Sequence, residues 1–312
     1  MTEVELIALV PGNHTEAPHP DLTVFSANGL TALIRPRKRR ALILPPGRKQ
    51  ALQTAAQRQS WLESALSIGP VLAARPDTVL SREAIASMIR ANRTLIDRVL
   101  ERLAGQVQFQ VSVTWTADGV LRRFRESPEL RPHFTRGQVS AQALRDAVHR
   151  LAGRLGKEME ARLGEVSTEC LSLPLTEDML LNAAVLIPPE AEDCLDRAVT
   201  AIDAIWTEGL HIRQIGPSPA VSFALLETRR FAAADVLEAS ILLGLDRHAP
   251  EGKIASARRS ALLRNPAESE TIRQAAELLL AARQFEDGAP VHLCRILSED
   301  HRAPERDRRE VA

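Results

Sequence analysis

The chain has 312 residues, of which 45% are hydrophobic and 26% are charged. This composition is that of a folded globular protein, and the length exceeds the roughly 100–200 residues of one ordinary domain, so two compact units are predicted. Forty basic and forty acidic residues cancel to a formal net charge of +0, which argues against nucleic acid as a partner. Tyrosine is absent and aromatic residues make up only 3%, so platforms for base stacking are not expected.

The first residues and the apolar runs of the chain bear on its location. The start, MTEVELIALVPGN, lacks the basic region and the long apolar stretch of a secretory signal. No later run approaches the ~18 uninterrupted apolar residues of a membrane span. Cys170, Cys194 and Cys294 are odd in number and far apart, which is typical of reduced thiols. We therefore expect a cytoplasmic protein without a membrane anchor or a disulfide framework.

The first half of the chain alternates short strands with helices. Residues 5–10 and 22–34 have the pattern of strands, and Asn28-Gly29 offers a turn inside the second segment. The basic and then proline-rich segment RPRKRRALILPPG follows as a loop. Residues 47–66 then have a one-sided apolar pattern, which predicts a helix that ends before Gly69-Pro70.

Residues 71–115 predict a strand, a helix and a second strand. A short strand at 71–74 leads to a helix that begins near Ser81, whose hydroxyl can cap it, and that ends at Gly105. Residues 107–115 then alternate apolar and polar side chains, the period of a strand with one buried face. Residues 1–117 are therefore predicted to form an N-terminal α+β domain with helices on one side of a sheet.

A second domain is predicted after a break. Residues 118–139 are charged and interrupted by Pro128 and Pro132, which indicates a linker. Residues 140–228 then predict, in order, a helix at 140–163, strands at 171–175 and 179–187, a helix at 190–208, and strands at 211–215 and 221–225. The order helix, strand, strand, helix, strand resembles part of a ferredoxin-like sandwich. The predicted fold class is α+β with two domains, the second of them ferredoxin-like.

The remaining chain predicts a helical C-terminal extension over residues 229–297. Helical periodicity occurs at 231–245, 251–263 and 269–283, and a short apolar segment follows at 291–297. Residues 298–312 are charged and lack an apolar face, so they are assigned to a flexible tail.

Two segments come close to catalytic or phosphate-binding motifs. Residues 216–220, GPSPA, differ by one residue from the GxSxG nucleophile elbow. Pro219 favours extended geometry at Ser218, and the following VSFALLE alternates like a strand, so a structural turn is predicted there. Residues 153–159, GRLGKEM, have the wrong glycine spacing for a phosphate loop and lie inside a predicted helix.

The histidines do not form a convincing metal site. His14 and His19 flank Glu16, and His292 lies two residues from Cys294. Neither group supplies the three or four ligands that a zinc site needs. We expect these side chains to be ordinary loop or core residues and expect no metal or other cofactor.

The charged clusters are interpreted as solvated surface. The run from Arg35 to Arg40 could contact phosphates, but it lacks interleaved aromatic residues, so an exposed loop is predicted. The acidic pairs Glu158/Glu160 and Glu190/Glu192 lie on predicted helices without a feature that would desolvate them. No catalytic residue is therefore assigned.

Three segments resemble the gas vesicle protein F/L family (GvpF/GvpL), over roughly residues 5–227. Residues 68–79, IGPVLAARPDTV, resemble the family's VLPxRFGTVF segment, with Pro76-Asp77 in place of Phe-Gly. The helix at 82–104 leads into GQVQFQVSV at 105–113, which is similar to LxGxVExxVKV. Residues 215–223, IGPSPAVSF, resemble TGPWPPYSF, with Ser218 and Val221 in place of Trp and Tyr.

The resemblance implies two α+β domains, the second ferredoxin-like, and no enzymatic activity. It implies association with the small hydrophobic shell protein GvpA, and with other gas vesicle accessory proteins, during vesicle assembly in the cytoplasm. It does not suggest a nucleic acid, membrane or small-molecule partner. The candidate protein-binding residues are those that match the family motifs, namely Arg75, Gly216, Pro217, Pro219 and Phe223.

Residues 237–284 weakly resemble a degenerate J-domain, in the segments LEASILLGL, KIASARRSALLRNP and IRQAAELLLAAR. Asn265-Pro266-Ala267 stands where that family carries His-Pro-Asp, so stimulation of that family's chaperone partner is not expected. A helical appendage that packs on the main domains explains the same periodicity. Two alternatives to a vesicle assembly factor stay open: an enzyme on a ferredoxin-like scaffold, and a co-chaperone that acts through the extension.

Overall fold

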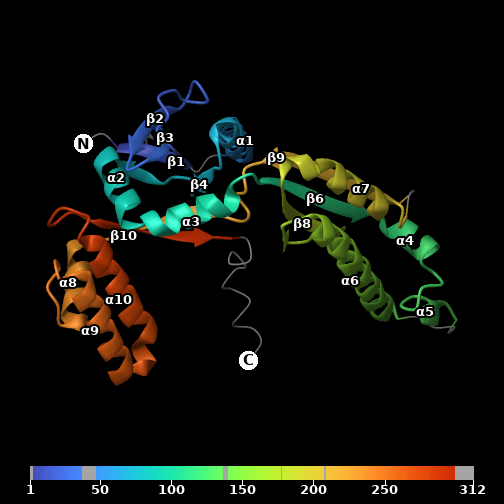
Figure 1. The fold of residues 1–312 in the computed structure, drawn as a ribbon. Coiled ribbons are helices and arrows are strands. Elements are labelled where there is room, and N and C mark those ends of the chain that lie inside the picture. The colour runs from blue at the N-terminus through green and yellow to red at the C-terminus, as the bar shows by residue number, and fades with distance from the viewer. Residues whose placement is uncertain (1–2, 37–46, 136–139, 177, 207–208, 299–312) are drawn as a thin grey trace. The chain divides into compact units, whose positions relative to one another are not determined.

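The computed structural model describes residues 3–36, 47–135, 140–176, 178–206 and 209–298. The chain forms two compact units. Unit 1 comprises residues 1–104 and 224–297, and unit 2 is built on residues 105–223. Each unit combines a sheet with helices (Figure 1), so the predicted α+β class is confirmed.

The sheet of unit 1 is centred on β1 (Glu3–Pro11), in which every residue from Val4 to Val10 is buried. The strand order is β11-β10-β4-β1-β3-β2, and β5 also pairs with β1. Asn28 and Gly29 have φ angles of +53° and +75° and form the turn between β2 and β3, as predicted. The bounds of the other strands are β2 (Thr23–Ala27), β3 (Leu30–Pro36), β4 (Leu72–Ala74), β5 (Val79–Ser81), β10 (Leu225–Phe231) and β11 (Val291–Leu297).

The helix predicted from Ser81 to Gly105 is two helices, α2 (Arg82–Ala91) and α3 (Arg93–Leu103). The Ser81 hydroxyl accepts a hydrogen bond from Ala84 N at 3.1 Å, the predicted cap. The break falls at Asn92, whose side chain donates to the carbonyl of Met88 (2.7 Å) and accepts from Cys294 N (2.9 Å). An asparagine that binds nearby backbone groups competes with the helix ladder, so periodicity alone does not reveal the break.

The remaining helices of unit 1 are α1, in the N-terminal part of the chain, and a C-terminal group after β10. The predicted helix at 47–66 is α1 (Arg48–Ala65), and η1 (Leu66–Ile68) follows it. The C-terminal part contains α8 (Ala233–Leu243), α9 (Glu251–Arg264), η3 (Pro266–Glu268) and α10 (Ser269–Ala282), and these helices pack side by side (Figure 1). Asn265 and Pro266 join α9 to α10. The J-like assignment of this group stays a prediction.

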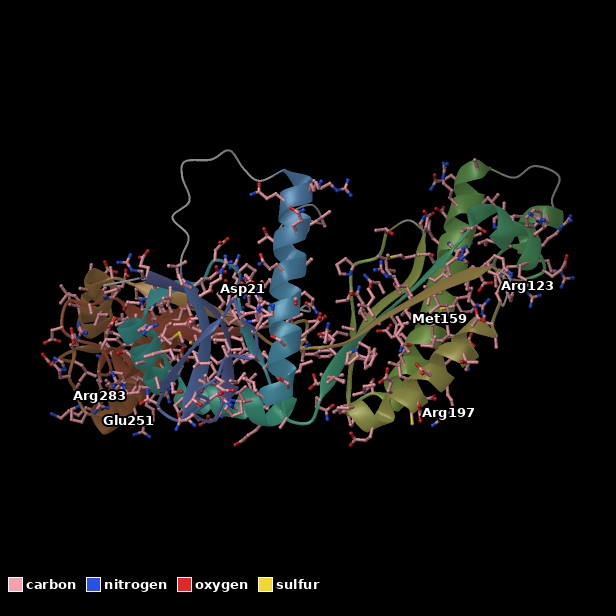
Figure 2. The ribbon with its side chains drawn as sticks, turned by 90° about the horizontal axis from the view of Figure 1, so that it is seen from above. Asp21, Arg123, Met159, Arg197, Glu251 and Arg283 are labelled. Carbon is pink, nitrogen blue, oxygen red and sulfur yellow. The ribbon has the colours of Figure 1, made fainter. Side chains whose placement is uncertain are left out.

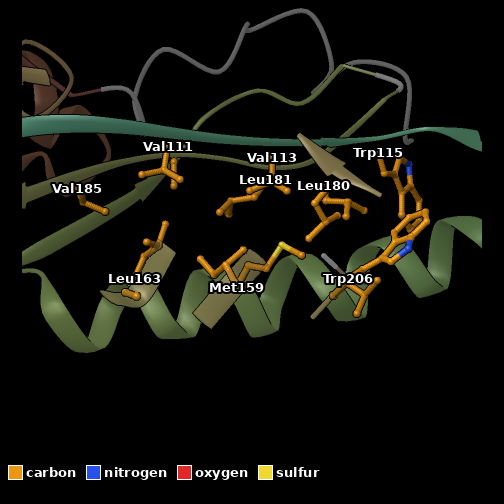
Figure 3. Packing of buried hydrophobic residues seen from close by; sticks show 14 of the residues in the cluster. Val111, Val113, Trp115, Met159, Leu163, Leu180, Leu181, Val185 and Trp206 are labelled. Carbon is orange, nitrogen blue, oxygen red and sulfur yellow. The ribbon is translucent and has the colours of Figure 1, made fainter. Parts of the chain in front are cut away.

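Unit 2 has an antiparallel sheet in the order β7-β8-β6-β9. The apolar residues of β6, from Val107 to Trp115, pack against two helices in one buried cluster. Figure 3 shows Val111, Val113 and Leu181 of the sheet facing Met159 and Leu163 of α6. The elements are β6 (Val107–Trp115), α4 (Ala117–Arg123), α5 (Arg131–Thr135), α6 (Ala141–Val166), β7 (Glu169–Ser172), β8 (Met179–Ile187), η2 (Pro189–Ala191), α7 (Glu192–Asp203) and β9 (Leu210–Ser218).

The structure divides the chain differently from the predicted boundaries. β6 lies in unit 2 and not in the domain predicted over 1–117. The segment predicted as a linker at 118–139 contains α4 and α5, and Val120 and Leu130 are 1% and 0% exposed in the core of unit 2. Two apolar side chains therefore anchor a segment whose overall composition is that of a linker.

The C-terminal extension is not purely helical. β10 and β11 pair over seven residues, and β10 pairs in parallel with β4. The strand predicted at 221–225 begins only at Leu225, because residues 221–223 form a turn in which Phe223 N donates to Ala220 O at 3.1 Å. Residues 224–297 thus belong to unit 1 and supply two strands of its sheet. The predicted flexible tail lies outside the described residues, apart from Ser298.

Candidate interaction surface

The family-like segment at 215–223 lies at the end of β9. Gly216 has a φ of +151°, and a Cβ built on it would lie 2.5 Å from Cδ1 of Phe109 and 2.8 Å from the Gln108 carbonyl oxygen. The pairing of β6 with β9 shifts register between Gln108 and Gln110, which makes a bulge at this point. Glycine alone suits both the backbone angle and the close contact. Gly216 therefore shapes the end of the strand.

Gln108 of β6 forms two hydrogen bonds with the residues that follow Gly216. Its carbonyl oxygen accepts a hydrogen bond from Ser218 Oγ at 3.2 Å, and its side-chain Oε1 accepts one from Ser222 N at 2.9 Å. Pro219 is buried, Pro217 is exposed, and Phe223 is only 1% exposed. The Ser218 hydroxyl is thus used for a backbone contact at the end of β9. The turn predicted at 216–220 is strand up to Ser218, and the turn follows at 221–223. Gln108 carries no sequence signal beyond the polar alternation of β6, so its role was missed.

Arg75, the remaining motif residue, lies in unit 1 at the end of β4. Its backbone N donates to Leu226 O at 2.8 Å, and its guanidinium forms an ion pair with Glu227. The Arg75 carbonyl oxygen accepts a hydrogen bond from Thr78 Oγ1 at 2.6 Å. The side chain is 59% exposed. Arg75 therefore links β4 to β10 and keeps an accessible surface.

Asp77 occupies the position where the family pattern has glycine, and its φ is +62°. A left-handed conformation costs a residue with a Cβ about 1–2 kcal/mol, with aspartate among the better tolerated. Replacing Asp77 with glycine is therefore expected to raise the free energy of unfolding by up to about 1 kcal/mol. Chemical denaturation measures this change. Asp77→Ala serves as the opposite control, since it keeps the Cβ and should lower stability; equal stability of both variants would contradict the argument.

One face of the unit 2 sheet is covered by α6 and α7. On β9, Leu210 and Ile212 lie opposite Trp115 and Val113 in the register, and all four belong to the apolar cluster beneath the helices. Directly opposed residues project to the same face. The α7 side chain Asp196 also reaches this strand, accepting a hydrogen bond from Gln214 Nε2 at 3.1 Å.

The alternate residues of β9 project to the other face. His211, Arg213 and Ile215 lie opposite Thr114, Ser112 and Gln110, and the three β9 side chains are exposed. Ile215 is 43% exposed. Among the described residues β9 pairs only with β6, so its second edge presents unpaired backbone groups. We define the β9 edge as His211, Arg213, Ile215, Gly216 and Pro217.

The three cysteines lie on β7, α7 and β11, and the histidines considered as metal ligands lie between β1 and β2 and on β11. Within the described ranges no group of three or more histidine, cysteine or acidic side chains could hold a metal ion. His14 Nε2 lies 3.0 Å from the Pro11 carbonyl oxygen. The three cysteines are free. Burial raises the pKa of the Cys294 thiol to about 12 and that of Cys170 to about 11, so both thiols stay protonated and unreactive.

Most of the basic run predicted as an exposed loop, from Arg37 to Arg40, lies outside the described residues. Its first member, Arg35, forms an ion pair with Glu5 at 2.6 Å and lies 4.7 Å from the centre of the Trp61 ring. Arg35 is therefore engaged within unit 1. None of the helices in the described part of the chain is long and apolar enough to cross a lipid bilayer.

Comparison with known proteins gives a consistent result. The chain matches the family model described as gas vesicle synthesis protein GvpL/GvpF over residues 11–224. It is 23% identical over 146 residues to gas vesicle protein F of Nostoc sp. strain PCC 7120, covering 41% of this chain and 58% of that protein. It is 24% identical over 156 residues to gas vesicle protein F of Dolichospermum flosaquae, covering 46% and 64%. The alignments thus span less than two thirds of either relative.

Two crystal structures share the fold. GvpF from Anabaena sp. PCC7120 superposes with a TM-score of 0.55 at 20% identity, covering 70% of this chain and 97% of that one. GvpF from Microcystis aeruginosa gives 0.53 at 21% identity, covering 70% and 98%. The family match ends at residue 224, directly before β10 begins. Because the match spans most of the chain, the chain belongs to the GvpL/GvpF family of gas vesicle synthesis proteins.

Proposed function

We propose that this protein is an accessory factor of gas vesicle formation that binds the small hydrophobic shell protein GvpA and prevents its aggregation before assembly. Family membership supports a role in gas vesicle synthesis. The proposal adds association with the vesicle and with other vesicle accessory proteins. It assigns the protein to binding and not to catalysis.

A shell subunit needs such a partner for a physical reason. A polypeptide that turns an apolar face to gas exposes that face, and any unpaired strand edges, until it is assembled. A second protein can cover an edge by adding a strand to its own sheet, so that main-chain hydrogen bonds provide affinity. The structural feature required is an accessible strand edge with apolar side chains beside it.

The β9 edge is the observation that carries the proposal. β9 is nine residues long, pairs on one side among the described residues, and exposes Ile215 beside the family-like Gly216-Pro217. We assign Gly216, Pro217 and Pro219 to shaping this edge. Phe223 would fix the segment from within the core, and the Arg75–Glu227 pair would support β10 after it.

We further infer that unit 2 is a ferredoxin-like domain. The chain order β6, α6, β7, β8, α7, β9 and the antiparallel sheet order β7-β8-β6-β9 support this assignment. Both long helices contribute to the same apolar cluster, which places them on one face. The opposite face and the two edge strands are then the surfaces available for a partner.

The test measures whether the full chain keeps GvpA soluble. Shell protein diluted from denaturant should stay in the supernatant when an equimolar amount of the full chain is present and should sediment without it. Ile215→Lys is expected to reduce the soluble fraction about tenfold, since a lysine on a strand edge blocks strand addition. The matched control is Leu175→Lys, which alters a 58% exposed leucine of the same unit and should leave solubility unchanged.

The outcomes test two hypotheses separately: that the chain keeps GvpA soluble, and that the β9 edge is the surface that binds it. If wild-type chain fails to keep GvpA in solution, the proposed function is wrong. If wild type succeeds and Ile215→Lys is equally active, the β9 edge is not the binding surface. Far-ultraviolet circular dichroism of both variants should match wild type, because each change is made on an exposed side chain.

A further inference from the structure

The sheet of unit 1 contains a place where two of its strands separate. β4 and β5 follow one another along the same edge of β1, since β3 pairs with the other edge. β10 pairs in parallel with β4 through Leu225 and Leu226. The last hydrogen bond from this stretch of chain to β10 joins Arg75 N to Leu226 O at 2.8 Å. Beyond it, no pairing joins β5 to β10 among the described residues.

β5 has an open edge on the side away from β1. The N–H and C=O groups of successive strand residues point alternately to the two edges of the strand. The Thr78 carbonyl oxygen accepts a hydrogen bond from Leu6 N of β1 at 2.8 Å, so Val79 directs its own N–H and C=O to the opposite edge. No strand of the described chain pairs with β5 on that edge. Val79 therefore presents an unpaired donor and an unpaired acceptor.

β10 has a matching open edge on the other side of the separation. Because Leu226 O bonds to Arg75 N, Leu226 directs its backbone groups toward β4. By the same alternation, Thr228 and Arg230 direct theirs to that side. The pairing with β4 ends at Leu226, so within the described ranges Thr228 and Arg230 have no strand partner there.

A cleft of about 840 Å³ lies between these edges, and we call it the β5–β10 cleft. It is lined by residues 79–81 of β5, by one side of α2 as far as Arg90, by Arg230 and His292, and by residues between Gln284 and Pro290. Arg90 Nη2 donates to the Gln284 carbonyl oxygen at 3.4 Å, which links α2 to the last of these segments. The volume is within the range of ligand sites, roughly 300–1,000 Å³.

His292 places a buried polar ring in the cleft. The residue is only 6% exposed, and Asn92 Nδ2 holds its backbone by donating to its carbonyl oxygen at 3.2 Å. No hydrogen bond joins its ring to another described residue, although Phe285 packs beside it at 6.2 Å between ring centres. Burial lowers the pKa of His292, so the neutral ring has one donor and one acceptor nitrogen. A buried polar group without a partner is costly, which points to a ligand that supplies one.

The charges around the cleft do not favour a strongly ionic ligand. Its charged residues are three carboxylates and two guanidinium groups: Glu3, Glu83, Glu286, Arg90 and Arg230. The first turn of α2 does not invite an anion, because the pKa of Glu83 is lowered by hydrogen bonds with its own backbone N–H and with Ser81. A peptide main chain is neutral and carries a donor and an acceptor on each residue, which matches both the open strand edges and the neutral ring.

We propose that the β5–β10 cleft binds an extended peptide segment, whose main chain pairs with the open edges at Val79 and Arg230 and whose polar groups bond to the ring of His292. The mode is strand addition, in which main-chain hydrogen bonds provide affinity. Because β5 has three residues, the paired part of the peptide is short. This site is separate from the β9 edge and does not depend on the proposed binding of GvpA.

Selection of peptides on the full chain tests the proposal. A phage library of random heptapeptides should yield sequences that bind the immobilised wild-type chain, and a synthetic copy should protect the amides of Val79, Thr228 and Arg230 from hydrogen exchange. A copy methylated on every second backbone nitrogen should bind about tenfold more weakly, because it keeps the side chains and loses main-chain donors. Failure to enrich any peptide, or equal binding of the methylated copy, overturns the proposal.

Variants of the chain locate the bound peptide. Val79→Pro removes an N–H that faces the cleft and none that pairs with β1, so it should weaken binding about tenfold; Val79→Ala keeps the N–H and is the matched control. His292→Phe keeps a ring and removes its nitrogens, and should weaken binding about fivefold. Arg283→Glu, at an exposed cation after α10 (Figure 2), and Ile215→Lys, on the β9 edge, should have no effect.

The two kinds of measurement support each other. The methylated peptide leaves the protein unaltered, so its result holds even where a variant unfolds. A peptide that binds Val79→Pro and His292→Phe as tightly as wild type occupies another surface and overturns the proposal. A peptide weakened only by Ile215→Lys occupies the β9 edge, which would support that edge as a binding surface and reject the β5–β10 cleft.

Discussion

Replacing Gly216 with alanine is expected to lower the free energy of unfolding by about 3 kcal/mol, the upper range for overpacking a buried site. The added methyl group would lie 2.5 Å from the Phe109 ring and 2.8 Å from the Gln108 carbonyl oxygen, and the φ of +151° disfavours any side chain. The Phe109 side chain is 1% exposed and belongs to the buried apolar cluster of unit 2, and protein interiors are close-packed. The strand end must therefore shift, which would also weaken the contacts of Gln108 with Ser218 and Ser222.

Chemical denaturation measures the loss of unfolding free energy, and hydrogen exchange shows which strands are destabilised. Amides of β6 and β9 should exchange faster in Gly216→Ala, while those of β1 and β3 in unit 1 should not change. Gly153→Ala is the matched control, because apart from its chain neighbours and the local helix backbone no atom lies within 4 Å of the added methyl group on α6. That change should raise stability by about 1 kcal/mol through helix propensity. Equal stability of Gly216→Ala and wild type would contradict the packing argument.

Local patterns predicted the individual elements well because burial on one face imposes a period on the sequence. β6 follows from the alternation of Val107 to Trp115, and α6 and α10 follow from their apolar periodicity. β5 was missed because its three residues run directly into the helix that begins after Ser81. The break at Asn92 was missed because it depends on a side chain that binds Cys294 N, a residue about 200 positions away.

The division into units could not be predicted from composition. Unit 1 joins residues at both ends of the chain, and the decisive contact is the parallel pairing of β10 with β4. That pairing depends on tertiary position, which no local pattern records. β10 also lacks the alternating apolar pattern of a strand. Only Leu225 and Leu226 are buried, and the charged residues Glu227, Arg229 and Arg230 follow them.

The assignment of the motif residues to protein binding stays a prediction. Gly216 and Phe223 were named because they match the family motif, and the structure shows a local packing role for each: a close approach to Phe109 and a place in the core. Their partner Gln108 was not named, because a buried glutamine looks the same in sequence as the exposed polar residues that alternate along β6. The β9 edge could not be foreseen either, since which strand ends a sheet is decided by topology.

The largest expected effect in unit 1 concerns Arg58 of α1, which is nearly buried at 12% exposure. Its guanidinium donates to the carbonyl oxygens of Ile7 (3.3 Å) and Ala74, and lies 3.4 Å from Glu5 Oε1. Burial lowers the pKa of Arg58, and the Glu5 carboxylate opposes that shift. Glu5 is itself 11% exposed and is shared with Arg35 at 2.6 Å. One cation thus joins α1 to two strands.

Arg58→Met is therefore expected to lower the free energy of unfolding by about 3–5 kcal/mol, the usual cost of removing one partner from a buried ion pair. Methionine keeps much of the side-chain volume, so the loss reports the charge and its hydrogen bonds and not a cavity. Trp61 lies one turn further along α1 and is 2% exposed, so its fluorescence measures detachment of the helix. Lys49→Met, at the exposed start of α1, is the matched control and should change stability by less than about 0.5 kcal/mol. A similarly small effect of Arg58→Met would mean that α1 is held by its buried apolar residues Trp61, Leu62 and Ala65, and that the hydrogen bonds and ion pair of Arg58 add no net stability.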